Sequence, residues 1–278
     1  ISLPSRASGR IAGSLRVIAR LAPAIIALAA MVQAAEPVGS GKLIPHWGAP
    51  VWEEEFNVDG APDPNVWSYQ LASRNNPQEQ QYYTDRPENV RVEGGALVLE
   101  LRKDNAIPAG ASDWQGSYEG HGGYTSGFIY SNPEKKDFLF GRIEFRAKLP
   151  IGSGSWPALW TTGNQQYWPA CGEIDVMEFW GSQENQDLAM PFVIAGTSHW
   201  DDESREGANP WDRHVWEMNY YPCPDPSADW HIYAMEWDAE EIRYFYDDVC
   251  YSSTDLTPAV RSELSTIRQA LRLNLAFD

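Results

Sequence analysis

Three carboxylates lie within six positions of one another, at Glu173, Asp175 and Glu178. The residues between them are Ile174 and a Val-Met pair, and this mixture of acidic, apolar and β-branched residues favours a strand. Two carboxyl groups that face one substrate are the minimal set for hydrolysis of a glycosidic bond. One carboxylate attacks the anomeric carbon, and the other carboxyl protonates the leaving oxygen. The segment is therefore the first candidate for a catalytic site.

The spacing of the three acids requires an irregular strand if all of them are to act together. In a regular strand, side chains alternate between two faces, so Glu173 and Asp175 share a face and Glu178 points into the core. A lone buried carboxylate is unfavourable. If Val176 or Met177 forms a β-bulge, Glu178 returns to the face of the other two acids. The sequence therefore predicts a bulge between Asp175 and Glu178.

The neighbouring residues argue against two simpler explanations of the acidic cluster. A solvated acidic edge is the common reason for such a run, but aromatic residues flank this one, with Trp168 before it and Phe179-Trp180 after it. A metal site built from the three carboxylates is disfavoured, because no His or Cys is placed to complete a transition-metal shell. We therefore expect the acids to face a substrate.

Aromatic residues are the second indication of a carbohydrate substrate. The chain contains 13 Trp and 13 Tyr, and Trp156 and Trp160 shortly precede the acidic strand. Flat indole rings suit the apolar faces of pyranose rings, although either residue could instead belong to the core. His199 lies in Thr-Ser-His-Trp, in a strand of mixed character, and a lone histidine in such a place is usually structural.

Short strands separated by turns account for most of the sequence after His46, which predicts an all-β sandwich or barrel. The expected elements are a hairpin at 89–101 that turns at Gly94-Gly95, strands at 141–149, 159–162, 173–179, 194–200, 230–237, 242–246, 249–251 and 271–276, and one helix at 258–266. Two long polar and aromatic loops are expected at 105–123 and 201–229.

The first 35 residues have the pattern of a secretion signal. Arg6, Arg10, Arg16 and Arg20 form a basic region, and an apolar run from 21 to 32 ends in small residues at the cleavage position. That run is too short to span a bilayer comfortably. We therefore expect a signal peptide at 1–35, a linker at 36–45 and a catalytic domain at 46–278, and a secreted or periplasmic protein.

The charge balance excludes several classes of partner. The net charge of the chain is −18, and without the four basic residues of the expected signal it would be −22, from 17 basic and 39 acidic residues. Such a surface repels nucleic acid and anionic membranes. It also disfavours highly sulfated polysaccharides. We expect a monomer with a polysaccharide as partner, no nucleic acid, and no membrane once the signal is removed.

The three cysteines leave the disulfide state open. They are Cys171, Cys223 and Cys250, and an odd number leaves at least one unpaired. A Cys223–Cys250 disulfide and three free thiols are equally compatible with the sequence.

The acidic segment resembles the bulged active-site signature of glycoside hydrolase family 16, Glu-Ile/Leu-Asp-x-x-Glu, and is most similar to its laminarinase-like (endo-β-1,3-glucanase) branch. Further segments are similar to the family as well, and together they span roughly 52–276. They are Asn75-Asn76, Gln81-Tyr82-Tyr83-Thr84, Glu88-Asn89-Val90, Thr125-Ser126-Gly127, Gly141-Arg142-Ile143-Glu144, the run 152–160 that contains Trp-Pro-Ala-Leu-Trp, and 230–237.

The resemblance implies a β-jelly-roll sandwich of two curved antiparallel sheets with a substrate cleft on the concave face. It implies retaining, endo-acting hydrolysis by a double displacement. By position, Glu173 would be the nucleophile, Glu178 the acid/base and Asp175 a helper. Asn76, Trp156, Trp160 and His199 match substrate-contact positions. No cofactor is expected for catalysis. Many members hold a structural calcium, for which Glu55 would be one ligand.

Three departures from the family pattern leave the substrate open. The segment 75–81 has extra residues compared with the usual Asn-Asn-Glu-x-Gln, the loop 201–229 is longer than expected, and the Gly-Gly and strand that normally follow Leu275-Ala276 are absent, which suggests truncation at a C-terminal strand. The resemblance favours β-1,3-glucan, but mixed-linkage β-glucan and β-galactan (agarase-like) are alternatives, since one catalytic strand serves several substrates. A non-catalytic glucan-binding protein is the alternative of another class.

Overall fold

The structure is a computed structural model, and it describes residues 14–19, 48–72, 78–113, 115–118, 122–134, 136–181, 192–207, 209–256 and 262–278. Strands dominate these residues, and the described helices are the short α1 (Ser262–Thr266) and a 3-10 turn, η1 (Pro210–Arg213). None of the described helices has the length and apolar character that crossing a bilayer requires.

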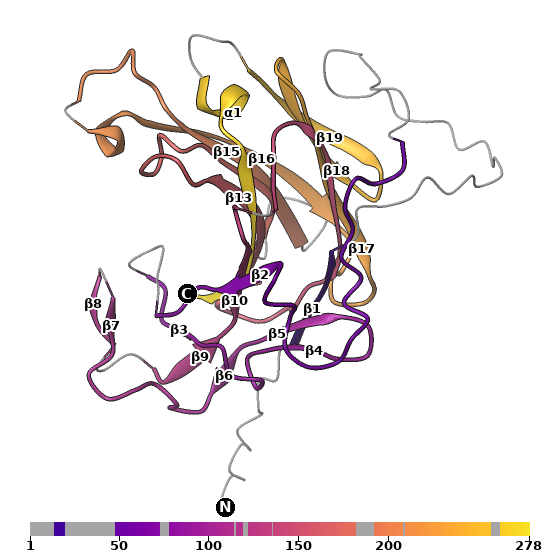
Figure 1. The fold of residues 1–278 in the computed structure, drawn as a ribbon, viewed down its shortest axis with the longest axis vertical. Helices are drawn as coiled ribbons and strands as arrows, with labels where there is room; N and C mark the ends of the chain where they lie inside the picture. Colours follow the sequence, from indigo (N-terminus) through magenta and orange to yellow (C-terminus); the bar gives the residue numbers. More distant parts are fainter. Residues whose placement is uncertain are drawn as a thin grey trace, which may run out of the picture.

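The larger of two main sheets carries the acidic segment. Its order is β16-β15-β14-β13-β20-β10-β2, with β11 added beside β20, and every pairing is antiparallel. The strands are β2 (Trp67–Tyr69), β10 (Phe128–Ser131), β11 (Asp137–Phe138), β13 (Ser155–Gly163), β14 (Glu173–Phe179), β15 (Phe192–Asp201), β16 (His214–Cys223) and β20 (Gln269–Phe277). The acid-bearing strand β14 thus lies two strands from the β16 edge. Figure 1 labels its neighbours β13 and β15, and β16 beyond β15.

The second main sheet has the order β19-β18-β17-β12-β1-β5-β4. Its strands are β1 (Ser14–Ala19), β4 (Val90–Val92), β5 (Leu97–Glu100), β12 (Gly141–Lys148), β17 (His231–Trp237), β18 (Glu241–Tyr246) and β19 (Val249–Asp255). The backbone of β1 pairs with β12 on one side and β5 on the other, although its residues fall within the expected signal. The rest of that segment and the linker at 36–45 lie outside the described residues.

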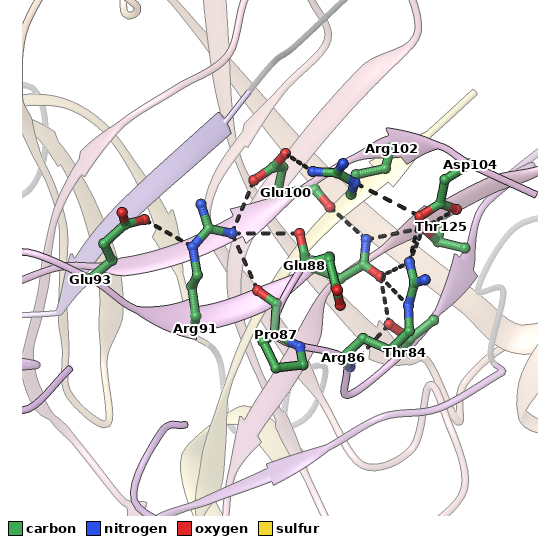
Figure 2. Close-up of polar contacts among 11 residues, drawn as sticks. Thr84, Arg86, Pro87, Glu88, Arg91, Glu93, Glu100, Arg102, Asp104 and Thr125 are labelled. Carbon is green, nitrogen blue, oxygen red and sulfur yellow. Dashed lines mark hydrogen bonds and ion pairs between the residues drawn. The ribbon is translucent and has the colours of Figure 1, made fainter. Parts of the chain in front are cut away.

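Two small sheets complete the fold. They are β3 (Tyr82–Tyr83), β9 (Tyr124–Ser126) and β6 (Arg102–Lys103), in the order β3-β9-β6, and the hairpin β7 (Ser112–Asp113) with β8 (Gly116–Ser117). A network of ion pairs connects the small β3-β9-β6 sheet to β4 and β5 of the second main sheet (Figure 2). Glu100 accepts from Arg91 at 3.0 Å and from Arg102 at 2.6 Å, and Arg86 pairs with Asp104 at 2.6 Å.

The main hydrophobic core lies between the two large sheets. It contains residues from both, including Phe145 and Tyr233 from one sheet and Ile174 and Leu273 from the other. In β12 the apolar residues are buried and the charged ones between them are partly exposed, as the alternating sequence predicts. The prediction of an all-β antiparallel sandwich is confirmed.

The sequence-based assignment was wrong for the region expected to be one loop at 201–229. It contains the 3-10 turn η1 and the ten-residue strand β16, which pairs along its whole length with β15. Strand β16 is an edge strand, and its partly exposed aromatic and polar residues lack the alternation of a half-buried strand. The expected helix at 258–266 is described only as α1, and the five residues before it lie outside the described residues.

Candidate functional site

A β-bulge lies between Asp175 and Glu178 in β14. On the side of β15, Asp175 pairs with Thr197 and Glu178 pairs with Ala195, so that two residues of β14 lie opposite the single Gly196. The two acids therefore have partners on the same face of β15 although three positions separate them. The predicted bulge is confirmed, and it places the three acids on one face of the sheet, which we call the acid-bearing face.

The pairing of β14 with β13 shows which residue is surplus. Trp160 pairs with Asp175 and Leu159 with Met177, so Val176 has no partner on β13. Both Val176 and Met177 are nevertheless buried in the main core. The bulge thus lets two consecutive apolar side chains enter the core while the strand keeps its acids outside it.

Gly196, opposite the bulge, is required by close packing from the second sheet. A Cβ atom at this position would lie 2.5 Å from the ring of Tyr244 and 2.7 Å from the hydroxyl oxygen of Tyr251. These distances are far shorter than a carbon atom tolerates. A glycine therefore allows the tyrosines of β18 and β19 to support the strand beside the acids.

Glu178 is held by two donors from neighbouring strands. Trp156 Nε1 donates to its Oε1 at 3.1 Å, and Thr197 Oγ1 donates to its Oε2 at 3.1 Å. Burial raises the pKa of Glu178, while the His199 charge and the two hydrogen bonds act in the opposite direction. A carboxyl with a raised pKa keeps its proton to higher pH and can act as an acid.

Glu173 has a different set of neighbours. Trp168 Nε1 donates to its Oε2 at 2.8 Å, and His199 Nε2 lies 3.8 Å from its Oε1. Burial, and then the charge of Asp175, raise the pKa of Glu173 to about 8, although His199 and Trp168 both favour the carboxylate. The two glutamates therefore have separate indole donors, Trp168 for one and Trp156 for the other.

Asp175 lies between the two glutamates and is the most enclosed of the three acids, with 3% of its surface exposed. Its Oδ2 lies 3.1 Å from His199 Nε2. Burial and then the charge of Glu178 raise its pKa well above the ordinary value. Three carboxyls this close cannot all ionise near neutral pH, because each charge opposes the next. Asp175 is the one best placed to retain a proton.

A second histidine, His214, extends the site away from the acids. Its Nε2 lies 2.9 Å from His199 Nδ1, and the two rings stack at 18° with centroids 5.1 Å apart. The ring of His214 also packs against the ring of Trp168, with 4.4 Å between the two ring centroids. Burial and the neighbouring His199 lower the pKa of His214 to about 4, so it is neutral at neutral pH. A neutral ring can donate or accept at this nitrogen, so one of the two rings donates to the other and the hydrogen bond links His214 to the histidine beside the acids.

The structure brings three of the four expected substrate residues to the acid-bearing face. Trp156 and His199 contact the acids as described above. Trp160 also lies on this face but is 8% exposed, and its Nε1 donates to Asn274 Oδ1 at 2.7 Å. Asn76 lies outside the described residues. Whether any of these residues contacts a substrate stays a prediction.

Sequence reasoning missed three side chains around the acids. Trp168 and Thr197 donate directly to the two glutamates, and His214 contacts the nearby histidine. The position of Trp168 just before the acidic strand was a usable signal. The contacts of Thr197 and His214 depend on the pairing of β15 with its two neighbours, which the sequence does not show.

A histidine does accompany the acids, contrary to the expectation that no His is placed to complete a metal site. Glu173 pairs with His199 across β14 and β15. Atoms of Glu173, Asp175 and His199 that could bind a metal all lie within 4.8 Å of one another. Among the described residues, this group does not include Glu55, so a structural calcium at Glu55 stays a prediction from the resemblance, and no step is assigned to it.

All three cysteines are described, and all three are free thiols. Burial raises the pKa of both Cys171 and Cys223 to about 12, which keeps them as unreactive thiols. Of the two alternatives that the sequence left open, the structure therefore has three free thiols and not a Cys223–Cys250 disulfide.

Comparisons with known proteins agree with this geometry. The family model described as Glycosyl hydrolases family 16 matches residues 77–273. The beta-glucanase of Rhodothermus marinus is 37% identical over 220 residues, which are 74% of this chain and 65% of that protein. The glucan endo-1,3-beta-glucosidase A1 of Niallia circulans is 29% identical over 218 residues, or 71% of this chain and 28% of that protein. The chain thus spans less than two thirds of the length of either relative.

The fold has a close counterpart among solved structures. The X-ray structure of the laminarinase from Rhodothermus marinus superposes with a TM-score of 0.64 and 33% sequence identity, and the match covers 82% of this chain and 85% of that one. The expected jelly-roll sandwich is confirmed by this likeness together with the sheet order above. The chain belongs to glycosyl hydrolases family 16.

Proposed function

We propose that the protein is an endo-acting, retaining glycoside hydrolase that cleaves β-1,3-glucan of the laminarin type. One observation carries the proposal: three carboxyls share one face of β14, and the two glutamates are held by different indole donors, Trp168 and Trp156. Different environments are what give two carboxyls different roles. The named relatives, a beta-glucanase and an endo-1,3-beta-glucosidase, support the same substrate class.

The reaction proceeds in two displacements. Glu173 attacks the anomeric carbon and forms a covalent bond to the sugar, while Glu178 gives its proton to the departing oxygen. Glu178 then takes a proton from water, and the water oxygen displaces Glu173. Asp175 holds the remaining proton between them, which lowers the repulsion that ionised Glu173 would otherwise experience.

Hydrolysis followed by proton NMR tests the nucleophile. Double displacement returns the β anomer as the first product. Glu173→Ala should lose nearly all activity and keep the fold, because the side chain lies on the acid-bearing face and not in the main core between the two sheets. An α anomer as the first product would rule out the retaining mechanism.

The role of Glu178 is tested by comparing two substrates. An acid matters most when the leaving group is a poor one, so Glu178→Ala should lose far more activity on polysaccharide than on an aryl β-glucoside with a good leaving group. Equal losses on both substrates would argue against this role.

The linkage needs a direct screen. Laminarin, lichenan, agarose and carrageenan are incubated with the protein, and new reducing ends are counted. Cleavage of laminarin is expected, while cleavage of lichenan or agarose alone would favour a mixed-linkage glucanase or a galactan hydrolase. Binding to glucan without any new reducing ends would favour a glucan-binding protein instead.

We also propose that the protein acts outside the cytoplasm, secreted or periplasmic, as a monomer. The basic and apolar pattern of residues 1–35 supports export. Mass spectrometry of the mature N-terminus tests the cleavage site, and sedimentation tests the monomer.

A further inference from the structure

Two exposed aromatic residues on β16 stand in the same rows as the two glutamates. Glu173 pairs with His199, which pairs with Trp216, and Glu178 pairs with Ala195, which pairs with Tyr220. Residues that pair directly across strands point to the same face of a sheet. Trp216 and Tyr220 therefore lie on the acid-bearing face, two strands from the acids, at the edge of the sheet.

Both side chains are unusually open for their type. Trp216 and Tyr220 are each 58% exposed, whereas large aromatic residues normally bury most of their surface. The residue between them on the same face is Met218, so the outward positions of this stretch carry no charge. An exposed, uncharged aromatic strip on a chain with a net charge of −18 marks a binding surface for a neutral partner.

The strip is continuous with the proposed site through stacked rings. The ring centroid of His214 lies 4.4 Å from that of Trp168 and 5.3 Å from that of Trp216. The rings of His214 and Trp216 are stacked, with an interplanar angle of 28°. Trp168 is the ring that donates to Glu173. A row of contacting rings therefore links Trp168, the donor to Glu173, with Trp216 on the edge strand.

We propose that Trp216 and Tyr220 form a binding platform for a distant part of the same polysaccharide chain that the acids cleave. This inference rests on the proposed function. Strands lie about 4.8 Å apart, so the platform is roughly 10 Å to the side of β14. That is too far to touch the sugar at the scissile bond, but within reach of sugars further along the chain. The platform thus selects long substrates and leaves the chemical step alone.

The test compares long and short substrates in the double variant W216A/Y220A. On laminarin, KM should rise about tenfold or more and kcat should stay within about twofold, since tenfold corresponds to about 1.4 kcal/mol. On laminaritriose, both constants should match the wild type. The ring-preserving variant W216F/Y220F should stay close to the wild type on both substrates. Val249→Ala, at an exposed apolar position on β19 of the other sheet, is the matched control and should change neither.

A second measurement separates this inference from the proposed function. Glu173→Gln protein, with and without W216A/Y220A, is run through native gels that contain laminarin, lichenan or agarose. Laminarin, or whichever of the three glycans slows the parent, should slow the double variant less. Three results would each overturn the platform. The glycans could retard the parent and the double variant equally, W216A/Y220A could lose as much activity on laminaritriose as on laminarin, or it could lose no activity on either. If the wild type cleaves none of these glycans, the proposed function is overturned instead. The gel retardation would then be the measurement that shows whether Trp216 and Tyr220 bind a glycan.

Discussion

Replacing Glu173 with glutamine should make the protein more stable at alkaline pH. The side chain of Glu173 is 15% exposed, and burial with the charge of Asp175 raises its pKa from 4.5 to about 8. Between these two values the native state keeps a proton that the unfolded chain has already released. Native stability therefore falls as pH rises through this window.

The shift sets the size of the effect. About 3.5 pKa units, at 1.36 kcal/mol each, correspond to about 5 kcal/mol between pH 4.5 and pH 8. Screening by the water that reaches the exposed part of the side chain reduces this figure, so we expect a loss of between about 2 and 5 kcal/mol. Glutamine has nearly the same shape, and its amide oxygen can still accept from Trp168, but it carries no charge to bury. Glu173→Gln should therefore match the wild type near pH 4.5 and exceed it by this amount at pH 9.

Urea unfolding at pH 4.5, 6, 7.5 and 9 measures the difference directly. Glu134→Gln, at an exposed turn position, is the control and should follow the wild-type curve at every pH. The kinetics offer an independent check, because the acid limb of kcat/KM reports the ionisation that makes the nucleophile. Parallel stability curves for Glu173→Gln and the wild type, with an acid limb near pH 4.5, would refute the argument that burial holds the proton on this carboxyl.

Four further changes, the first two a matched pair of deletions, follow from the geometry of β14 and β15. Deleting Val176, which has no partner on β13, should leave a folded protein with measurable hydrolysis. Deleting Ile174 should abolish both the fold and the hydrolysis. Melting curves measure the fold, and reducing-end assays measure the hydrolysis. Thr197→Val removes a hydrogen bond that favours the Glu178 carboxylate, so the alkaline limb of the pH–rate profile should move up by about 0.5 to 1 unit; a downward move would contradict the assignment. Gly196→Ala should lower the free energy of unfolding by at least about 1–3 kcal/mol, because its new methyl group meets a tyrosine ring at 2.5 Å, and an unchanged melting temperature would show that the ring moves aside.

The elements that the sequence predicts well are those in which each residue has one environment. The hairpin at Val90–Val92 and Leu97–Glu100 turns at two glycines with φ of 60° and 75°, which the Gly-Gly pair indicates directly. Strand β12 alternates cleanly, and β14 begins and ends at the expected residues. Local periodicity and turn chemistry suffice in such segments.

Strand β16 shows where local pattern fails. Its sequence contains Asn219 and Pro222, residues that are depleted in strands, and its exposed aromatics look like loop residues. It is a strand because β15 offers ten consecutive partners, and such pairing is a tertiary effect. At an edge, a proline is tolerated because one side of the strand has no ladder to complete.

The candidate site divides in the same way. The shared face of the three acids and the bulge follow from period-two alternation and from the high free energy of a buried carboxylate. Both can therefore be predicted from the sequence. The partners of the acids do not follow, because Thr197 and His214 come from strands whose register against β14 is set by the whole sheet. Trp160 illustrates the remaining ambiguity: it lies on the acid-bearing face, yet its indole is committed to Asn274.

The position of β20 has a consequence for how the chain acquires its fold during synthesis. Residues 269–277 come after all the other described strands of the acid-bearing sheet, yet β20 lies between β13 and β10 in its middle. Until these residues leave the ribosome, that sheet consists of two separate pieces, and β13 has an open edge. Long-range pairing of this kind is slow, and open edges bind other chains. The nascent protein therefore passes through a stage in which it is both incomplete and prone to aggregation, and slower translation of the preceding segments would prolong that stage.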